Sequence, residues 1–375
     1  MLYIHIPFCK RLCAYCDFHS SMSLERKEQM VHALLCEMEE RKNYLPAPLF
    51  PATLYFGGGT PSTLSPAELH GLIEKARLLF TPPAFSEITV EINPDDSTPE
   101  YIAQLRDMGV NRLSIGVQSF QERLLKLLQR RHSAQQAIDC VKTAQSAGFK
   151  NITIDLMYGL PQQTPEEWRQ DIAQALSLHV PHISAYHLSI EPKTLFGKQY
   201  AKGTLSLPEE ATGVQQFLYL HDTLEDAGYV HYEISNFARD GFRAEHNSGY
   251  WKGFPYLGVG PSAHSYNGQS RQWNMANNRR YIEAIENRQP AFEIELLTTG
   301  MRFNEYLLTS LRTAEGADLQ YMEKTFGKPF LQHCLQQAQQ HLSAGVLVRT
   351  GNQLQIPPRR FLLADAIIRD LFRIE

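Results

Sequence analysis

The residues that decide the fold of this chain are 2–16, LYIHIPFCKRLCAYC. Residues 2–6 combine β-branched and aromatic side chains, a pattern that predicts a strand. Cys9, Cys13 and Cys16 follow on a short loop. Three thiols this close together, in a chain with only six cysteines, indicate a metal or redox site in a reducing compartment rather than a disulfide framework.

Thiolates are the usual ligands of iron in iron-sulfur clusters, which normally take four of them. A loop with three thiolates leaves one iron open, and S-adenosylmethionine (SAM) can chelate that iron through its amino and carboxylate groups. Electron transfer from the cluster would then cleave the sulfonium to a carbon radical. The loop therefore predicts a 4Fe-4S cluster with SAM. A structural zinc site with His5, His19 or Asp17 as fourth ligand, or thiols that ligate nothing, are the alternatives.

The composition is that of an ordinary soluble globular protein, with 43% hydrophobic residues, 20% charged residues and a formal net charge of -4. This charge argues against nucleic acid as a partner. No apolar run is long enough to span a bilayer, and no secretory signal pattern is present, although a transient contact with a membrane surface is allowed. The expected location is the cytoplasm.

Runs of β-branched residues alternate with helical patterns in the first half of the chain, which predicts a parallel sheet of βα units. The expected strands are 2–6, 53–56, 87–92, 112–117, 151–157 and 182–188. Six strands are too few for a closed eight-stranded barrel. The expected fold class is therefore α/β, a partial (β/α)6 barrel with its site at the carboxyl ends of the strands.

Local signals define several helix ends. Ser65 and Thr164 each begin a capping box, and Gly109, Gly148 and Gly228 stand where a helix would end in a left-handed residue.

The rest of the chain divides into two expected regions after a barrel at residues 1–207. Residues 208–295 are less regular and rich in aromatic residues, as in an α+β region that covers the mouth of a barrel. Residues 296–375 predict helices, a hairpin at 346–356 and a last helix. This order is that of a small winged-helix-like module, without the basic face that DNA binding needs.

Four motifs resemble those of the radical SAM family. They are YIHIPFC at 3–9, the CxxxCxxC spacing that begins at Cys9, FGGGTP at 56–61 and GVQSF at 116–120. More narrowly, they resemble the branch that contains oxygen-independent coproporphyrinogen III dehydrogenase and the HemW haem chaperones. The resemblance runs through essentially the whole chain, and the ordered set of motifs is more specific than any one of them.

A glycine loop follows the second expected strand, where backbone without side chains can approach a ligand closely. The resemblance implies that Gly58, Gly59 and Thr60 contact the methionine part of SAM.

Further cofactor positions are expected at the ends of other strands, where a barrel displays its working residues. Glu91, Gln118 and Asp155 stand at such ends. A carboxylate can accept both hydroxyls of a ribose, so Glu91 or Asp155 could hold the nucleoside. The resemblance adds three residues to the expected SAM set, Tyr3, Tyr15 and Arg130.

Two departures separate the chain from the dehydrogenase. There the cluster motif continues to a further cysteine, and here that position is Phe18. The chain also begins almost at its first strand, without the extension that the dehydrogenase carries. Both features resemble the chaperones.

The stretch HNSGYW at 246–251 matches the HNxxYW pattern that is associated with haem in the chaperones. A neutral imidazole such as that of His246 can ligate haem iron, and Tyr250 and Trp251 offer flat faces to a porphyrin. His264 is a second candidate ligand. Residues 208–295 are accordingly the expected porphyrin-binding region.

The resemblance implies a haem chaperone with a 4Fe-4S cluster, SAM and haem as cofactors. It would deliver haem to respiratory or storage proteins, receive electrons from a donor such as flavodoxin or ferredoxin, and lack coproporphyrinogen oxidation activity. The alternatives are an oxygen-independent coproporphyrinogen III dehydrogenase and a zinc-stabilised binding protein.

Overall fold

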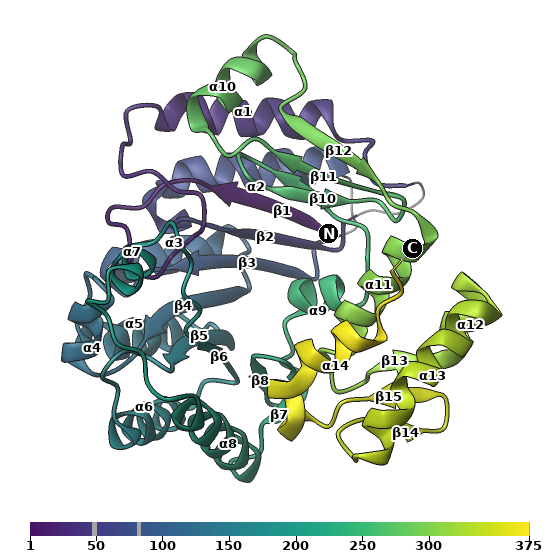
Figure 1. Ribbon diagram of the computed structural model, residues 1–375. Coiled ribbons are helices and arrows are strands. Elements are labelled where there is room, and N and C mark those ends of the chain that lie inside the picture. Colours follow the sequence, from purple (N-terminus) through teal and green to yellow (C-terminus); the bar gives the residue numbers. More distant parts are fainter. Residues whose placement is uncertain (47–50, 81–83, 375) are drawn as a thin grey trace.

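The computed structural model describes residues 1–46, 51–80 and 84–374, and the centre of the fold is a sheet of nine strands (Figure 1). Six of them pair in parallel in the order of the sequence and curve into an open barrel. Their bounds are Leu2–Ile6 (β1), Thr53–Gly58 (β2), Glu87–Ile92 (β3), Arg112–Gln118 (β4), Asn151–Tyr158 (β5) and His182–His187 (β6). The six predicted strands and the partial barrel are thus confirmed.

Apolar side chains at alternate positions, which form the hydrophobic core, explain why these strands lie in the centre. Leu2, Ile4 and Ile6 of β1 are all fully buried, as expected of a parallel strand covered by helices. The covering helices are Lys27–Glu40 (α1), Pro66–Phe80 (α2), Pro99–Asp107 (α3), Glu122–Leu127 (α4), Ala134–Ser146 (α5), Pro165–Ser177 (α6), Leu195–Ala201 (α7) and Glu210–Asp226 (α8). Two 3-10 turns, Pro61–Thr63 (η1) and Pro94–Asp96 (η2), follow β2 and β3.

The predicted helix signals are present. Thr164 caps α6 in a reciprocal capping box with Glu167, and Ser65 and Glu68 exchange the same pair of hydrogen bonds before α2. The three predicted end glycines, Gly109, Gly148 and Gly228, have φ of +89°, +87° and +83°. These left-handed residues turn the chain from a helix toward the next strand.

Three short strands extend the barrel sheet at its edges. Val230–Glu233 (β7) and Asn236–Ala238 (β8) form an antiparallel pair, with β8 next to β6, and Leu257–Val259 (β9) pairs in parallel with β1. Glu245–Trp251 (α9) lies at the amino-terminal ends of β2 and β3, where the backbone N–H of Glu245 donates to the Glu87 carboxylate. The region expected to cover the mouth therefore also closes the opposite end of the barrel.

A second sheet and a C-terminal module complete the fold. The second sheet consists of His264–Tyr266 (β10), Ser270–Asn274 (β11) and Phe292–Leu296 (β12), and Asn278–Glu286 (α10) packs near α1 (Figure 1). The module contains Thr299–Ser310 (α11), Ala317–Asp318 (β13), Leu319–Phe326 (α12), Lys328–Ser343 (α13), Val348–Thr350 (β14), Gln353–Gln355 (β15), Pro358–Leu363 (η3) and Ala364–Leu371 (α14). The predicted hairpin is β14 and β15, which together with β13 form the three-stranded wing of a winged-helix-like module.

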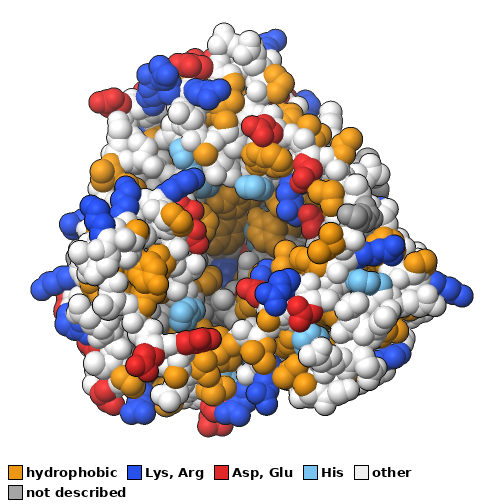
Figure 2. Space-filling view, in the orientation of Figure 1, with side chains coloured by type: hydrophobic (Ala, Val, Ile, Leu, Met, Phe, Trp, Pro, Cys, Tyr) orange, Lys and Arg blue, Asp and Glu red, His pale blue; other side chains and the backbone are white. Residues whose placement is uncertain are grey.

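The face in Figure 2 has a deep central hollow lined by hydrophobic side chains, between the barrel and the C-terminal module. Within the residues that the structure describes, none of the helices combines the length and apolar character needed to cross a bilayer.

Candidate functional site

The three cysteines predicted to ligate iron lie on the loop that leaves β1 at its carboxyl end. Main-chain hydrogen bonds hold this loop. The N–H of Cys9 donates to the Ser21 carbonyl over 3.0 Å, and the N–H of Ala14 donates to the Leu128 carbonyl over 3.1 Å. All three thiols are free; that of Cys9 is buried and the other two are half-buried. The fold thus fixes the loop and leaves its thiols free for ligation.

Two polar side chains donate hydrogen bonds to the sulfur atoms. Thr60 Oγ1 donates to Cys9 Sγ and Arg130 Nη1 donates to Cys13 Sγ, each over 3.4 Å. Such contacts stabilise negative charge on sulfur. Burial raises the pKa of the Cys16 thiol to about 11, so a bound cation is needed to favour its thiolate at neutral pH.

Two of the three side chains considered as a fourth zinc ligand, His5 and His19, are engaged in hydrogen bonds. Tyr3 donates a hydrogen bond to His5 Nδ1 over 3.2 Å, and His5 Nε2 donates to the His19 carbonyl over 2.8 Å. His19 Nε2 pairs with Asn278, and Asp17 is exposed. Among the described residues, no three His, Cys, Asp or Glu side chains surround a point where one ion could sit. A cubane attaches each thiolate to a different iron, so the three thiols suit a cluster better than one zinc ion.

The predicted glycine loop packs against β1 and the start of the cysteine loop. Gly58 has φ of +109°, and a Cβ atom there would lie 2.5 Å from His5 Nδ1. A Cβ atom on Gly59 would lie 2.6 Å from the Phe8 carbonyl oxygen. Both positions require glycine. The N–H of Gly59 donates to the Ile6 carbonyl over 2.9 Å, so this amide serves the fold instead of facing a ligand.

A polar chain links two of the cysteines through a residue that sequence reasoning missed. Asn93 donates to Thr60 Oγ1 over 3.2 Å and accepts from Arg130 Nη2 over 2.6 Å. Because Thr60 contacts Cys9 and Arg130 contacts Cys13, Asn93 fixes the distance between the two donors. The only signal in the sequence is its place at the end of a barrel strand.

Two predicted carboxylates face the barrel interior from β3 and β5. Tyr55, also missed, donates to Glu91 Oε1 over 2.8 Å, and Ser114 donates to Asp155 Oδ2 over 3.2 Å. Burial raises the pKa of Glu91 to about 7 and that of Asp155 to about 6. The negative charge of Asp155 also contributes to the raised pKa of Glu91. Each can change protonation near neutral pH.

The remaining predicted positions also gather near the mouth. Gln118 ends β4 at a bulge with φ of +67°, and a Cβ atom on Gly116 would lie 3.1 Å from its amide nitrogen. Burial raises the pKa of Tyr15, and the nearby charge of Arg130 opposes this shift. The fold therefore brings Tyr15, Gln118 and Arg130 to the same end as the cysteines, whereas Tyr3 lies near the start of β1.

Inside the barrel lies a cavity of about 460 Å³, which we call the barrel cavity. Tyr3, Glu91 and His264 line it, together with Phe18 at the mouth. The Phe18 side chain is 71% exposed. The cavity thus extends from Phe18, on the loop that carries the cysteines, to Glu91.

His246 lies away from the cysteines, on α9 at the amino-terminal ends of the strands. Its Nδ1 is hydrogen-bonded to Thr53 Oγ1 over 2.8 Å and its Nε2 to the Tyr250 hydroxyl over 3.0 Å. Burial lowers the pKa of His246 to about 3, so the ring is neutral. Neither nitrogen is free for iron in this arrangement. The second candidate, His264, is exposed.

A partial barrel with three free thiols at its mouth is the arrangement of a radical SAM protein, and residues 3–175 match the model of the radical SAM superfamily. The chain is 34% identical to the heme chaperone HemW of Lactococcus lactis subsp. lactis (strain IL1403), over 97% of this chain and 95% of that protein. It is 39% identical to the heme chaperone HemW of Escherichia coli (strain K12), over 70% of this chain and 69% of that protein. The chain belongs to the HemW family.

A solved structure is also similar over the whole fold. It is the Escherichia coli coproporphyrinogen III oxidase HemN, described as a radical SAM enzyme, with a TM-score of 0.83 and 25% identity. The match covers 99% of this chain and 89% of HemN. The barrel and the C-terminal parts thus share the architecture of HemN.

Proposed function

We propose that this protein is a cytoplasmic haem chaperone that holds a 4Fe-4S cluster, binds SAM and passes haem to acceptor proteins. The observation that carries the proposal is the three-thiol loop at the barrel mouth, in a chain similar to HemW over 97% of its length. Respiratory or storage proteins would receive the haem, and a flavodoxin or ferredoxin would supply electrons.

The cluster would be held by Cys9, Cys13 and Cys16. Arg130 places its charge beside Cys13, and burial of its guanidinium keeps this charge away from bulk water. In the barrel, SAM would supply a sulfonium whose reductive cleavage yields a carbon radical. Glu91, held by Tyr55, would accept hydrogen bonds from ribose hydroxyls when ionised. The other proposed SAM contacts are Tyr3, Tyr15, Gly58, Gly59, Thr60, Gln118 and Asp155.

Haem binding is proposed for residues 208–295, which contain the HNxxYW stretch. Tyr250 and Trp251 lie at the end of α9 and line a large cavity. Their flat apolar faces suit a porphyrin. His246 supports Tyr250 through the hydrogen bond between the two side chains.

The second candidate is an oxygen-independent coproporphyrinogen III dehydrogenase, and the likeness to HemN over 99% of the chain favours it. Phe18 stands where the dehydrogenase has its further cysteine, which argues for the chaperone. Anaerobic incubation with coproporphyrinogen, a reductant and SAM separates the two candidates. A chaperone leaves coproporphyrinogen unchanged, whereas accumulation of protoporphyrinogen would establish the dehydrogenase.

Haem titration of the pure protein tests the chaperone directly. We expect a Soret band at stoichiometric haem that weakens in His246→Ala and not in His70→Ala, a control at an exposed position on α2. Absence of a Soret band in the folded wild-type protein would refute the proposal. Zinc without iron or sulfide after anaerobic purification would support the zinc-stabilised alternative instead.

A further inference from the structure

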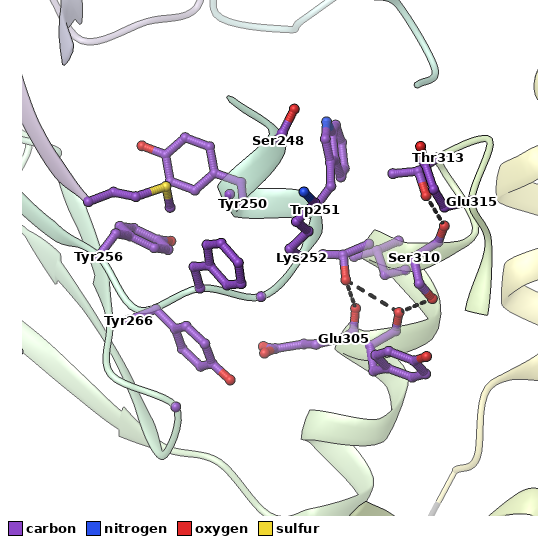
Figure 3. Close-up of a pocket in the computed structure, with 18 of the residues that line it drawn as sticks. Ser248, Tyr250, Trp251, Lys252, Tyr256, Tyr266, Glu305, Ser310, Thr313 and Glu315 are labelled. Atoms are coloured by element: carbon purple, nitrogen blue, oxygen red, sulfur yellow. Dashed lines mark hydrogen bonds between the residues drawn. The ribbon is translucent and has the colours of Figure 1, made fainter. Parts of the chain in front are cut away.

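A second, larger cavity lies outside the barrel, between α9, the β10–β12 sheet and helices α11 and α12 (Figure 3). We call it the α9 cavity. Its volume is about 1060 Å³, just above the usual range for small-molecule sites. Met1 and Thr53 line it, so it opens at the amino-terminal ends of the strands. The length of β2 separates this end from the mouth by roughly 16 Å.

One wall of the α9 cavity is a row of three tyrosines. The rings of Tyr250 and Tyr256 meet edge to face with centroids 4.8 Å apart, and the centroids of Tyr256 and Tyr266 are 6.3 Å apart. Figure 3 shows these three side chains along one side of the cavity, with Glu305 and Ser310 of α11 on the other. This wall offers a large, flat, apolar surface.

The facing wall, from α11 and α12, is also aromatic. The ring of Tyr306 lies 5.0 Å from that of Tyr321 and 5.8 Å from that of Phe326. Two aromatic walls on opposite elements favour a flat ligand that contacts both. The Tyr321 side chain is 50% exposed at the rim. A ligand could therefore enter without opening the barrel.

Cationic side chains lie at the edge of this space. Arg271 is paired with Glu305 over 2.7 Å. In the described parts of the chain, Arg302 and Lys252 form no ion pair, and the Nε–H of Arg302 is buried without a hydrogen-bond partner. The indole N–H of Trp251 is also buried without one. The charges of Arg302 and Lys252, which line the cavity and are not neutralised by a described carboxylate, favour an anionic ligand.

We propose that the α9 cavity is the porphyrin site, with the disc between the two aromatic walls and its carboxylates at Arg302 and Lys252. This assignment rests on the proposed haem-binding function and specifies where the haem is held. No histidine is among the described residues that line the cavity. Affinity therefore comes from ring contacts and carboxylate contacts, and protoporphyrin without iron binds as well.

The barrel cavity is the less suitable site for the same ligand. Its volume of about 460 Å³ is less than half that of the α9 cavity. Arg112 on its wall is already committed to Asn151 and Thr153. Tyr250 and Tyr256 line both cavities, so the two adjoin, and haem in the α9 cavity leaves the barrel cavity to SAM.

The test is a titration of the full-length protein with haem, metal-free protoporphyrin and the dimethyl ester of each. We expect Arg302→Gln and Lys252→Gln each to weaken binding of the free acids about ten-fold and to leave ester binding unchanged, because the esters lack the charges that these side chains bind. Arg279→Gln, on the exposed side of α10, is the matched control and should have no effect.

A second variant blocks the cavity without changing its charge. Thr325→Trp places a bulky side chain at an exposed position of α12 that lines the cavity and should weaken acids and esters alike by ten-fold or more. Lys324→Trp, at the neighbouring exposed position that does not line it, should bind haem as the wild type does. Circular dichroism checks that each variant is folded.

The outcomes are distinct. If haem binding is unchanged in Thr325→Trp and Arg302→Gln but lost in His264→Ala, haem lies in the barrel cavity. This result overturns the assignment of haem to the α9 cavity, and the chaperone proposal stands. Absence of haem binding by the wild-type protein overturns both.

Discussion

At the scale of single residues, the protonation of Glu91 links the pH to the affinity for SAM. Burial and the charge of Asp155 raise the pKa of Glu91 from 4.5 to about 7. Between pH 4.5 and pH 7, Glu91 therefore keeps its proton in the ligand-free folded chain, whereas it has lost the proton in the unfolded chain. Because the folded chain binds the extra proton, the free energy of unfolding falls as the pH rises from 4.5 to 7. Binding to ribose hydroxyls needs the opposite, ionised form.

We therefore predict that SAM binds about ten-fold more weakly at pH 6 than at pH 8, because the ionised fraction of Glu91 changes by that factor around a pKa of about 7. Equilibrium binding of SAM to the reconstituted protein measures this. In Glu91→Gln the affinity should be lower and nearly independent of pH. An unaltered pH profile in that variant would show that another group titrates.

His246 allows a second prediction, because its two ring nitrogens are occupied by Thr53 and Tyr250. If it positions Tyr250, then Tyr250→Phe should weaken haem binding as His246→Ala does, and His246→Gln should recover part of the loss. The variants should also lose stability, by about 1 to 3 kcal/mol for a broken buried hydrogen bond. A Soret maximum that moves in His246→Ala but not in Tyr250→Phe would instead identify His246 as an iron ligand.

At the scale of secondary-structure elements, the glycine loop determines how closely β2 approaches the cysteine loop. Gly59→Ala should destabilise the chain by about 1 to 3 kcal/mol and reduce cluster retention, because the new Cβ atom would lie 2.6 Å from the Phe8 carbonyl oxygen. Gly71→Ala is the matched control. No atom lies within 4 Å of its added Cβ, and alanine in the interior of α2 should stabilise it by up to about 1 kcal/mol.

Denaturant unfolding and iron content of the two variants measure these effects. Equal stability and equal iron content in Gly59→Ala and the wild type would mean that the loop relaxes, and the argument from close approach would be wrong.

The barrel strands could be predicted from the sequence because each carries buried apolar residues at alternate positions, and the structure moves their ends by two residues at most. Strands β7, β8 and β9 have only three or four residues each, too few for a pattern to emerge. Their place at the sheet edges depends on tertiary pairing. For this reason the position of α9 at the closed end of the barrel could not be predicted.

The same distinction holds within the candidate site. The cysteines, the glycines and the carboxylates have informative spacings or places at strand ends, and the barrel brings them together. Asn93 and Tyr55 matter through contacts with residues more than 30 positions away in the sequence, and nothing near them in the sequence indicates those partners.

At the scale of the whole molecule, the barrel has two ends with different tasks in the proposed account. The cysteines, the glycine loop and Gln118 lie at the carboxyl ends of the strands, and the α9 cavity lies at the amino-terminal ends. We predict that SAM and haem stabilise the chain additively, each by about 2.7 kcal/mol at a hundred-fold excess over its Kd. Thermal unfolding with either ligand and with both tests this. A combined effect no larger than that of one ligand would indicate overlapping sites.

The central claim is that three thiols hold a cluster with one iron open to SAM. Paramagnetic resonance of the reduced cluster, after anaerobic reconstitution and with and without SAM, tests it most directly. We predict a 4Fe-4S signal that changes when SAM is added, is lost in Cys13→Ala and is kept in Cys36→Ala, whose thiol lies on α1 away from the loop. A signal that SAM leaves unchanged, or a reconstituted protein without iron and sulfide, would contradict the account.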